Sequence, residues 1–500
     1  MHQTIKYFSG VIILTLITVL SVYSEIRLPR LISDGMILQC ESPLIIWGWA
    51  DEGEKVMLEF NNQTYEALTP ADCRWQICLP PMKAGGPYGM RFKGNNEIIL
   101  NDVLFGEVWL CCGQSNMEYP LSRLTDKYSK EIADCANKFI RQFKVPLSYN
   151  FDEPGKDYLS GSWKSVTPES ILDFSAVAYF FARELFNKYR IPVGIINASV
   201  GGSPAEAWMS ADALIDFPDY LAETEKFRNK VYVEELRSAE RKAEKEWYEL
   251  LNSTDKGLLS SPGWKDPGFD ASAWPHIMIP SFWVNQDSAE VNGVVWFRRE
   301  IDVPSSMAGK SARLFLGRIV DADSVFINGV FTGTTSYQYP QRRYLVPEGL
   351  LHSGKNTIVV RVISNSGQGG FIKEKPYRLF TGNDTIELTG MWHYQRGCVM
   401  KPTPGQTFVQ WKPTGLYNAM LAPANPFIIK GVLWYQGESN VERYQEYQKL
   451  LTALISDWRE KRGQGNFPFI VAQLPNYMSA SEIPTESNWA MFRYIQLKTV

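Results

Sequence analysis

The sequence lacks an excess of charge of either sign, with a formal net charge of −3 over 500 residues. Nucleic-acid-binding domains present a basic face to phosphates, so this balance gives no support to a nucleic acid partner. Cys-x-x-Cys pairs and clustered histidines are also missing, and the four histidines lie far apart in the chain. Zinc sites need ligands at short, regular spacings. We therefore predict neither a metal nor a cofactor.

Long apolar runs are absent after the first 25 residues. Residues 1–24 contain Lys6, then an apolar run from Phe8 to Val22, then small residues, as is typical of a signal peptide. The alternative is an N-terminal membrane anchor, but the run is short beside the roughly 20 residues that span a bilayer. We predict an exported protein, periplasmic or secreted, without membrane attachment once the signal is cleaved.

Cysteine is scarce, and its seven residues are an odd number, which leaves at least one free thiol if the others pair. Cys73 and Cys78 flank a short segment and could form a bridge. Cys111 and Cys112 lie in an apolar run, where we expect buried, inert thiols. The sequence carries no signal for an oligomeric state.

Several domains are expected, because a chain this long exceeds one compact core. Residues 25–105 contain short strands separated by turns, which predicts a small β-sandwich. Residues 106–255 alternate apolar strands with helical segments, which favours a parallel sheet with helices on its faces. Within them, the charge-rich stretch 221–251 is predicted to be a solvated helix.

A second β-rich block follows at residues 256–395, with hairpin signals such as Asn328-Gly329. Residues 396–500 then return to a buried strand, a helix and another strand. The fold class is therefore predicted to be multidomain, α/β plus all-β. A doubly wound parallel α/β domain is interrupted by a β-sandwich or jelly-roll insert and preceded by the small β-sandwich.

Three polar segments follow apolar strands of the predicted α/β domain: GQSNM at 113–117, NASVGGSPAEAW at 197–208 and WYQGESN at 434–440. Ligands of open parallel sheets bind beyond the carboxyl ends of the strands. The three segments are therefore expected to meet at one edge of the sheet.

The residue types in these segments suit ester hydrolysis. Ser115 opens a helix and can attack a carbonyl carbon. Gly201 and Gly202 let backbone N–H groups approach a substrate closely, and Gln436 carries an amide donor. Such donors stabilise the oxyanion of the tetrahedral intermediate. Taken singly, Ser115 could equally be a helix cap, the glycines a tight turn and Gln436 part of a hydrogen-bonded loop.

The three motifs, in this order, resemble the conserved blocks of the SGNH-hydrolase superfamily, and more closely those of the sialate O-acetylesterase family of carbohydrate acetylesterases. The resemblance implies that Ser115 is the nucleophile and that Ser115, Gly202 (or Gly201) and Gln436 form the oxyanion hole. Gln114, Asn116, Gly201 and Glu438 are expected in the substrate pocket. The implied substrate is an acetylated carbohydrate, with O-acetyl esters on sialic acid or related sugars.

The β-rich insert carries a resemblance of its own. WFRREIDVP, LFLGRIVDADSVFINGVFTG and NTIVVRV are similar to the sugar-binding jelly roll of β-galactosidase-type glycoside hydrolases. The two resemblances together cover essentially the whole chain after the predicted signal peptide.

The sequence departs from the family in its proton acceptor. The family supplies a histidine and an aspartate from an Asp-x-x-His segment near the C-terminus, and a serine hydrolase needs such a base. None of His2, His276, His352 and His393 stands in that setting. We expect the catalytic His and Asp to lie outside this chain, as in a C-terminally truncated sequence. His393 is the nearest remaining candidate.

Two other functions stay open. The missing histidine would suit a non-catalytic carbohydrate-binding protein. The jelly roll would suit a glycoside hydrolase, which needs two carboxylates about 5–10 Å apart. Glu438 is the one conspicuous acid in these loops, and a carboxylate is a poor base for serine unless its pKa is strongly raised.

Overall fold

The computed structural model describes residues 25–283, 292–365, 367–373, 375–477, 482–483 and 485–499. The predicted signal peptide, 1–24, lies outside the described residues. The chain divides into two compact units. Unit 1 comprises Met1–Arg228 with Val409–Val500, and unit 2 comprises Asn229–Phe408.

Unit 1 begins with the expected short strands. Its helices and strands up to residue 199 are β1 (Ile37–Gln39), β2 (Leu44–Trp49), β3 (Lys55–Phe60), β4 (Gln63–Leu68), β5 (Arg74–Leu79), β6 (Gly85–Lys93), β7 (Glu97–Gly113), α1 (Ser115–Glu118), η1 (Leu121–Leu124), α2 (Ser129–Asp134), β8 (Asn137–Lys144), β9 (Trp163–Val166), η2 (Ser170–Asp173), α3 (Ala176–Tyr189) and β10 (Val193–Ser199).

The remaining elements of unit 1 lie on both sides of unit 2 in the sequence. They are η3 (Ala205–Trp208), η4 (Asp212–Leu214), α4 (Pro218–Arg228), η5 (Val409–Trp411), η6 (Tyr417–Leu421), η7 (Ala422–Ala424), β23 (Gly431–Tyr435), η8 (Glu438–Arg443), α8 (Tyr444–Arg462), β24 (Phe469–Val471) and α9 (Asn488–Thr499).

Strand β7 joins the small β-domain to the α/β domain without a break. Its first part pairs antiparallel with β6, from Glu97 to Phe105. Its second part pairs parallel with β10 and β23. The predicted boundary at 105/106 therefore falls inside one continuous strand, which a change of composition does not reveal.

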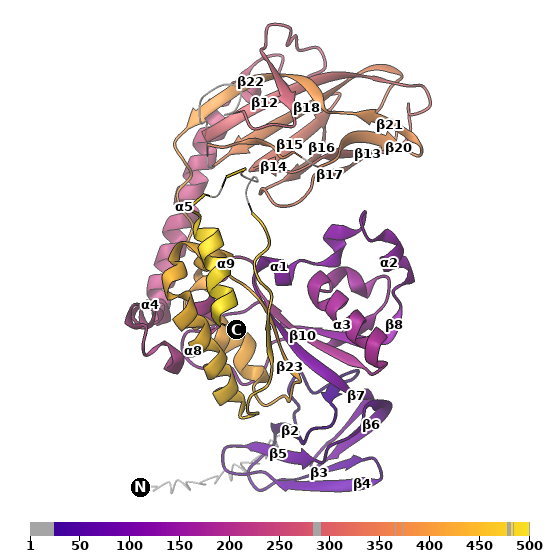
Figure 1. Cartoon of the computed structure of the whole chain (residues 1–500). Helices are drawn as coiled ribbons and strands as arrows, with labels where there is room; N and C mark the ends of the chain where they lie inside the picture. Colours follow the sequence, from indigo (N-terminus) through magenta and orange to yellow (C-terminus); the bar gives the residue numbers. More distant parts are fainter. Residues whose placement is uncertain are drawn as a thin grey trace, which may run out of the picture. The chain divides into compact units, whose positions relative to one another are not determined.

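The parallel sheet has helices on both faces, as predicted (Figure 1). Successive β7 side chains point to opposite faces: Trp109 and Cys111 pack in the cluster that contains α3, whereas Leu110 and Cys112 pack in the cluster that contains α8. Both faces are thus apolar, which explains the unbroken hydrophobic run of this strand. Ser175 caps α3 by accepting a hydrogen bond from the N–H of Ala178 at 3.1 Å.

Unit 2 is an all-β sandwich preceded by helices. Its elements are α5 (Lys230–Thr254), α6 (Lys256–Leu259), β11 (His276–Ile279), β12 (Asn292–Val303), β13 (Ala312–Leu316), β14 (Ile319–Val320), β15 (Ala322–Ile327), β16 (Val330–Thr335), β17 (Arg343–Val346), β18 (Gly354–Ser364), β19 (Gly370–Phe371), β20 (Tyr377–Thr381), β21 (Asp384–Glu387) and β22 (Gly390–Met400).

The sandwich consists of a six-stranded sheet in the order β11-β22-β12-β18-β15-β16 and a four-stranded sheet in the order β17-β13-β20-β21. The hairpin predicted at Asn328-Gly329 is confirmed, because Ile327 pairs with Val330. Both turn residues have positive φ, 49° and 80°, as two-residue hairpin loops favour.

The boundary of unit 2 lies before the one predicted at residue 256. The charge-rich stretch is helical, as predicted, but Trp247 and Leu251 of α5 pack with Trp264 and Trp296 of the β-block. Asp255 strengthens this attachment, since its carboxylate accepts from the Nε of Arg361 at 2.7 Å. Helix α5 is therefore part of unit 2.

The cysteines in the apolar run are buried, as predicted, and burial raises the pKa of the Cys111 and Cys112 thiols. Cys73 and Cys78 are both exposed and free, so the suggested bridge is not formed. Over the described residues, no helix is long and apolar enough to cross a membrane.

Candidate active site

Three loops leave the same edge of the parallel sheet. In the strand register, Gly113 at the end of β7 lies beside Ser199 of β10 and Tyr435 of β23. The segments that begin at Gln114, Val200 and Gln436 therefore start side by side. The meeting of the three motifs follows from strand order, as the sequence predicted.

The turn before Ser115 requires glycine. Gly113 has φ of +139°, and a Cβ on it would lie 2.0 Å from the carbonyl oxygen of Tyr435. The N–H of Gln114 donates to that oxygen at 3.0 Å. The chain thus turns sharply out of β7, and Ser115 begins α1 as an exposed residue. Its hydroxyl is accessible to a substrate.

Gly201 lies against Ser115. A Cβ on Gly201 would be 3.8 Å from the Cβ of Ser115 and 2.8 Å from Oε2 of Glu118. The N–H of Gly201 donates to that same Glu118 oxygen at 2.7 Å. Glu118, one helical turn after Ser115, therefore fixes the glycine loop to α1.

Gly202 is the second glycine of the pair, and it has φ of +77°. A Cβ there would lie 2.1 Å from the ring of Trp411, so no larger residue fits. Within the described residues its amide hydrogen has no acceptor, in contrast to that of Gly201. This difference makes Gly202 the better placed of the two to donate to a ligand.

Gln114 is buried and ties two loops together. Its Oε1 accepts from the N–H groups of Gly437 at 3.1 Å and Ser439 at 3.3 Å. The hydroxyl of Ser439 in turn donates to the carbonyl of Gly202 at 2.7 Å. These contacts hold the 437–439 loop beside the start of α1, and the expected place of Gln114 in the substrate pocket stays a prediction.

Gln436 does not have the geometry expected of an oxyanion donor. Its side chain is fully buried, and Nε2 donates to Oδ1 of Asn440 at 2.6 Å and to the carbonyl of Ser203 at 3.3 Å. Its Oε1 accepts from the hydroxyl of Tyr447 at 2.8 Å. Both amide hydrogens already have acceptors, so this side chain braces the 203 and 440 loops.

Asn440 continues that network. Its Oδ1 also accepts from the N–H of Ala205 at 3.0 Å, and its Nδ2 donates to Oε2 of Glu206 at 2.9 Å. Arg443 pairs with the other oxygen of Glu206 at 2.7 Å. Asn440, Glu206 and Arg443, together with Glu118 and Ser439, were not predicted as site residues. Four of these five residues lie inside or directly after the quoted motifs.

Asn116, the residue after Ser115 in the chain, contacts Glu438. Nδ2 of Asn116 donates to Oε1 of Glu438 at 2.7 Å. Burial raises the pKa of the Glu438 carboxyl, against the opposing effects of its backbone hydrogen bond and of Asn116. Oε2 of Glu438 is buried and has no partner among the described residues. The two residues thus form a polar group with one unused acceptor.

The histidines lie elsewhere. His276, His352 and His393 all belong to unit 2, and unit 1 has no histidine among its described residues. His393 is paired with His276 across β11 and β22, with ring centroids 4.2 Å apart. The described part of the chain also contains no cluster of three His, Cys, Asp or Glu side chains suited to a metal ion.

Comparison with known proteins shows similarity to carbohydrate esterases and to a β-galactosidase domain. Residues 392–500 match the family described as carbohydrate esterase, sialic acid-specific acetylesterase, and residues 260–368 match the β-galactosidase second all-β domain. A crystal structure of a carbohydrate acetylesterase from Xanthomonas citri is similar to this chain with a TM-score of 0.54 and 25% identity. That match covers 95% of this chain and 66% of the other. These matches show similarity to carbohydrate esterases.

Curated sialate O-acetylesterases are similar to part of this chain. The sialate O-acetylesterase of Rattus norvegicus is 32% identical over 207 residues, and that of Homo sapiens is 29% identical over 206 residues. These alignments cover 38% of this chain and 38% and 39% of the relatives, so the chain matches little more than a third of their length. The chain is thus similar to sialate O-acetylesterases over part of its length, and residues 260–368 are similar to a β-galactosidase-type all-β domain.

Proposed function

We propose that the protein is a sialate O-acetylesterase-like carbohydrate esterase that hydrolyses O-acetyl esters on sialic acid or related sugars, with Ser115 as nucleophile. The observation that carries the proposal is the exposed Ser115 beside the glycine pair, at the edge where three strands end. The similarity to sialate O-acetylesterases and to a carbohydrate acetylesterase supports the reaction class and the acetylated carbohydrate substrate.

The proposed reaction is acyl transfer in two stages. The Ser115 oxygen attacks the acetyl carbonyl carbon and gives up its proton to a base, and the carbonyl oxygen becomes an oxyanion. The sugar oxygen leaves with a proton, and the acetyl group remains on Ser115. Water then hydrolyses this ester, releasing acetate and the free serine.

Backbone donors suit the oxyanion better than the Gln436 amide. The N–H of Gly202 has no acceptor within the described residues, and the first N–H groups of a helix have no partner inside the helix, which favours those at the start of α1. We assign the oxyanion site to Ser115 and Gly202. Each such donor is worth about 3–4 kcal/mol of barrier. Glu118, Gln114 and Gln436 act through the positions of these groups.

The family's base is a histidine in an Asp-x-x-His segment, which this sequence does not contain. This observation favours a second candidate, a non-catalytic carbohydrate-binding protein. The comparisons give no support to either binding alone or glycoside hydrolysis over ester hydrolysis.

Turnover of p-nitrophenyl acetate, with and without added imidazole, separates the candidates. The leaving group of this ester needs no protonation, and imidazole supplies a base from solution. We expect Ser115→Ala to lower the enzymatic rate by at least about 100-fold and to abolish the imidazole-dependent increase above the solution background.

The matched control is Ser129→Ala. Ser129 is also exposed and also the first residue of a helix, α2, and its replacement should leave turnover unchanged. Equal turnover by the wild type and Ser115→Ala would exclude Ser115 as nucleophile. A protein that binds acetylated sialic acid without any Ser115-dependent turnover would be the carbohydrate-binding protein.

A further inference from the structure

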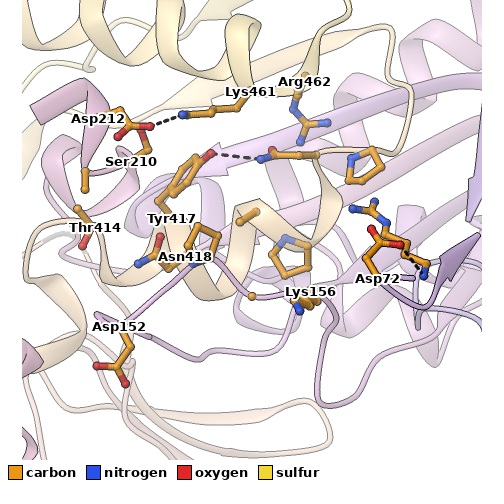
Figure 2. A pocket seen from close by; sticks show the side chains of 18 of the residues that line it. Asp72, Asp152, Lys156, Ser210, Asp212, Thr414, Tyr417, Asn418, Lys461 and Arg462 are labelled. Carbon is orange, nitrogen blue, oxygen red and sulfur yellow. Dashed lines mark hydrogen bonds and ion pairs between the residues drawn. The ribbon is translucent and has the colours of Figure 1, made fainter. Parts of the chain in front are cut away.

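Unit 1 contains a cavity of about 710 Å³ that the esterase proposal does not use (Figure 2). None of Ser115, Gly202, Gln436 and Glu438 lines it. One wall is formed by Arg462, whose Nη1 binds the carbonyls of Ala424 and Phe427. These carbonyls precede β23, whereas the Ser115 site lies beyond its carboxyl end. The volume is in the range of about 300–1,000 Å³ that is usual for small-molecule sites.

The lining is richer in cationic than in acidic side chains. The cationic ones are Arg74, Lys156, Arg228, Lys461 and Arg462. The acidic ones are Asp72, Asp152 and Asp212. Asp212 pairs with Lys461, and Arg228 pairs with Glu225 at 2.6 Å. Arg74 and Arg462 have no carboxylate partner within the described residues.

Arg462 is a buried cation that lacks a counter-charge. The residue is only 8% exposed, and its Nη2 has no hydrogen-bond partner among the described residues. The groups that interact with its charge are Cys112, Tyr158 and Tyr417, which are ordinarily neutral thiols and phenols at pH 7. A buried charge is costly unless it is paired, so this guanidinium is suited to an anion from outside.

Two further polar atoms of the lining are buried and unpartnered in the same part of the chain: Nε of Arg74 and Oγ1 of Thr414. Thr414 is 1% exposed and has φ of +64°. A β-branched residue in this region is a backbone outlier, and such strain is concentrated at functional sites. Three open polar atoms on one cavity are independent indications of a ligand.

We propose that this cavity is a second binding site, distinct from the Ser115 site, for a sugar-sized organic oxyanion, in which the guanidinium groups of Arg74 and Arg462 hold the carboxylate or phosphate group. Planar guanidinium groups bind both oxyanions by paired hydrogen bonds. The lining also contains the polar side chains of Ser210, Tyr417, Asn418 and Asn425. The Ser210 hydroxyl donates to Asp457, and the amides of Asn418 and Asn425 donate to the Asn150 carbonyl and the Tyr417 hydroxyl, so their remaining acceptor capacity faces the hydroxyl groups of such a ligand.

The test is isothermal titration calorimetry on the whole chain, with glucuronate as the carboxylate probe, glucose 6-phosphate as the phosphate probe and glucose as the neutral control. We expect the wild type to bind one or both anionic sugars and not glucose, and the stronger probe identifies the oxyanion. Ser115→Ala should bind them unchanged, which separates this site from the esterase site.

Arg74→Gln should weaken binding by at least about tenfold, since hydrogen bonds from charged groups are among the stronger ones. Its control is Arg91→Gln, because Arg91 is an exposed arginine of the same β-domain that does not line the cavity. Arg462→Lys, which retains the charge, provides a second variant. Absence of binding by the wild type, equal binding of glucose, or unchanged binding by Arg74→Gln would overturn the proposal.

Discussion

Two buried carboxylates of unit 2 have their partners within the protein, whereas two buried charged groups of unit 1 each keep one atom without a partner among the described residues. In unit 2, Asp323 accepts from Nε of Arg342 and from the hydroxyl of Tyr344, each at 2.6 Å. Asp255 is equally satisfied by Arg361 and by the indole N–H of Trp296. In unit 1, Glu438 and Arg462 each keep a buried atom without a partner among the described residues.

This contrast distinguishes buried polar groups that stabilise the fold from buried polar groups that are available to a ligand. A fully satisfied buried network fixes a core and has no capacity left for a ligand. An open acceptor or donor is costly unless a ligand completes it. On this basis we expect the buried ion pairs of Asp323 and Asp255 in unit 2 to contribute to stability, and the unpartnered atoms of Glu438 and Arg462 in unit 1 to be available to ligands.

The largest expected effect comes from breaking a closed pair in unit 2. Arg342→Ala leaves the Asp323 carboxylate buried without its cation, and burial already raises the pKa of that carboxyl against the effect of Arg342. We expect a loss of about 3–5 kcal/mol in the free energy of unfolding, measured by urea denaturation. Lys355→Ala, which removes an exposed pair with Glu300, should cost less than about 1 kcal/mol.

The glycine pair tests the site geometry next. Gly202→Ala introduces a Cβ at positive φ against Trp411, and we expect a loss of about 2–4 kcal/mol in stability together with most of the esterase activity. In Gly201→Ala the new Cβ meets only the end of the flexible Glu118 side chain, so the stability loss should stay below about 1 kcal/mol. Equal thermal stability of the two variants would contradict the close packing of Gly202 against Trp411, and unchanged esterase activity of Gly202→Ala would contradict its place in the oxyanion site.

Gln436 lies in unit 1, but its buried side chain has hydrogen-bond partners for both amide atoms within the protein. Gln436→Met removes its bonds to Asn440, Ser203 and Tyr447, and we expect a stability loss of about 2 kcal/mol, because buried partners are left unsatisfied. An oxyanion donor would behave differently, with a rate loss of about 100- to 1,000-fold and little change in stability. Denaturation and steady-state kinetics on the same preparation distinguish the two.

The smallest expected effect is a pH dependence of stability that comes from the Glu438 carboxyl, whose Oε2 has no partner among the described residues. Its folded-state pKa is raised, so the folded protein binds the proton more tightly than the unfolded chain, and stability falls as the pH rises from the ordinary Glu pKa of about 4.3 through the raised value. Glu438→Gln should remove this part of the pH dependence. The melting temperatures of the wild type and the variant are measured as a function of pH. The same pH dependence in both proteins would refute this prediction.

The sequence predicted the features that depend on local pattern. The apolar runs that form β7, β10 and β23 and the helices α3 and α8 are recognisable from their periodicity, and strand order alone brings Ser115 to the glycine pair. The direction of the Gln436 side chain was not predictable, because it depends on Tyr447 and Asn440 after folding.

Other features depend on contacts between distant segments. The continuity of β7 across residue 106 depends on pairing with β6 on one side and β10 on the other. The attachment of α5 to unit 2 depends on Trp247 and Asp255 packing against strands far along the chain. The cavity at Arg462 likewise combines residues from positions 49 to 462, so no local motif marks it.

The most direct test of the central claim is peptide mass spectrometry of the protein after brief reaction with p-nitrophenyl acetate and imidazole, followed by acid quenching. We predict an acetyl group on the peptide that contains Ser115, absent from the Ser115→Ala variant and present in Ser129→Ala. An acetyl group confined to another residue, or equal labelling of the Ser115→Ala protein, would contradict it.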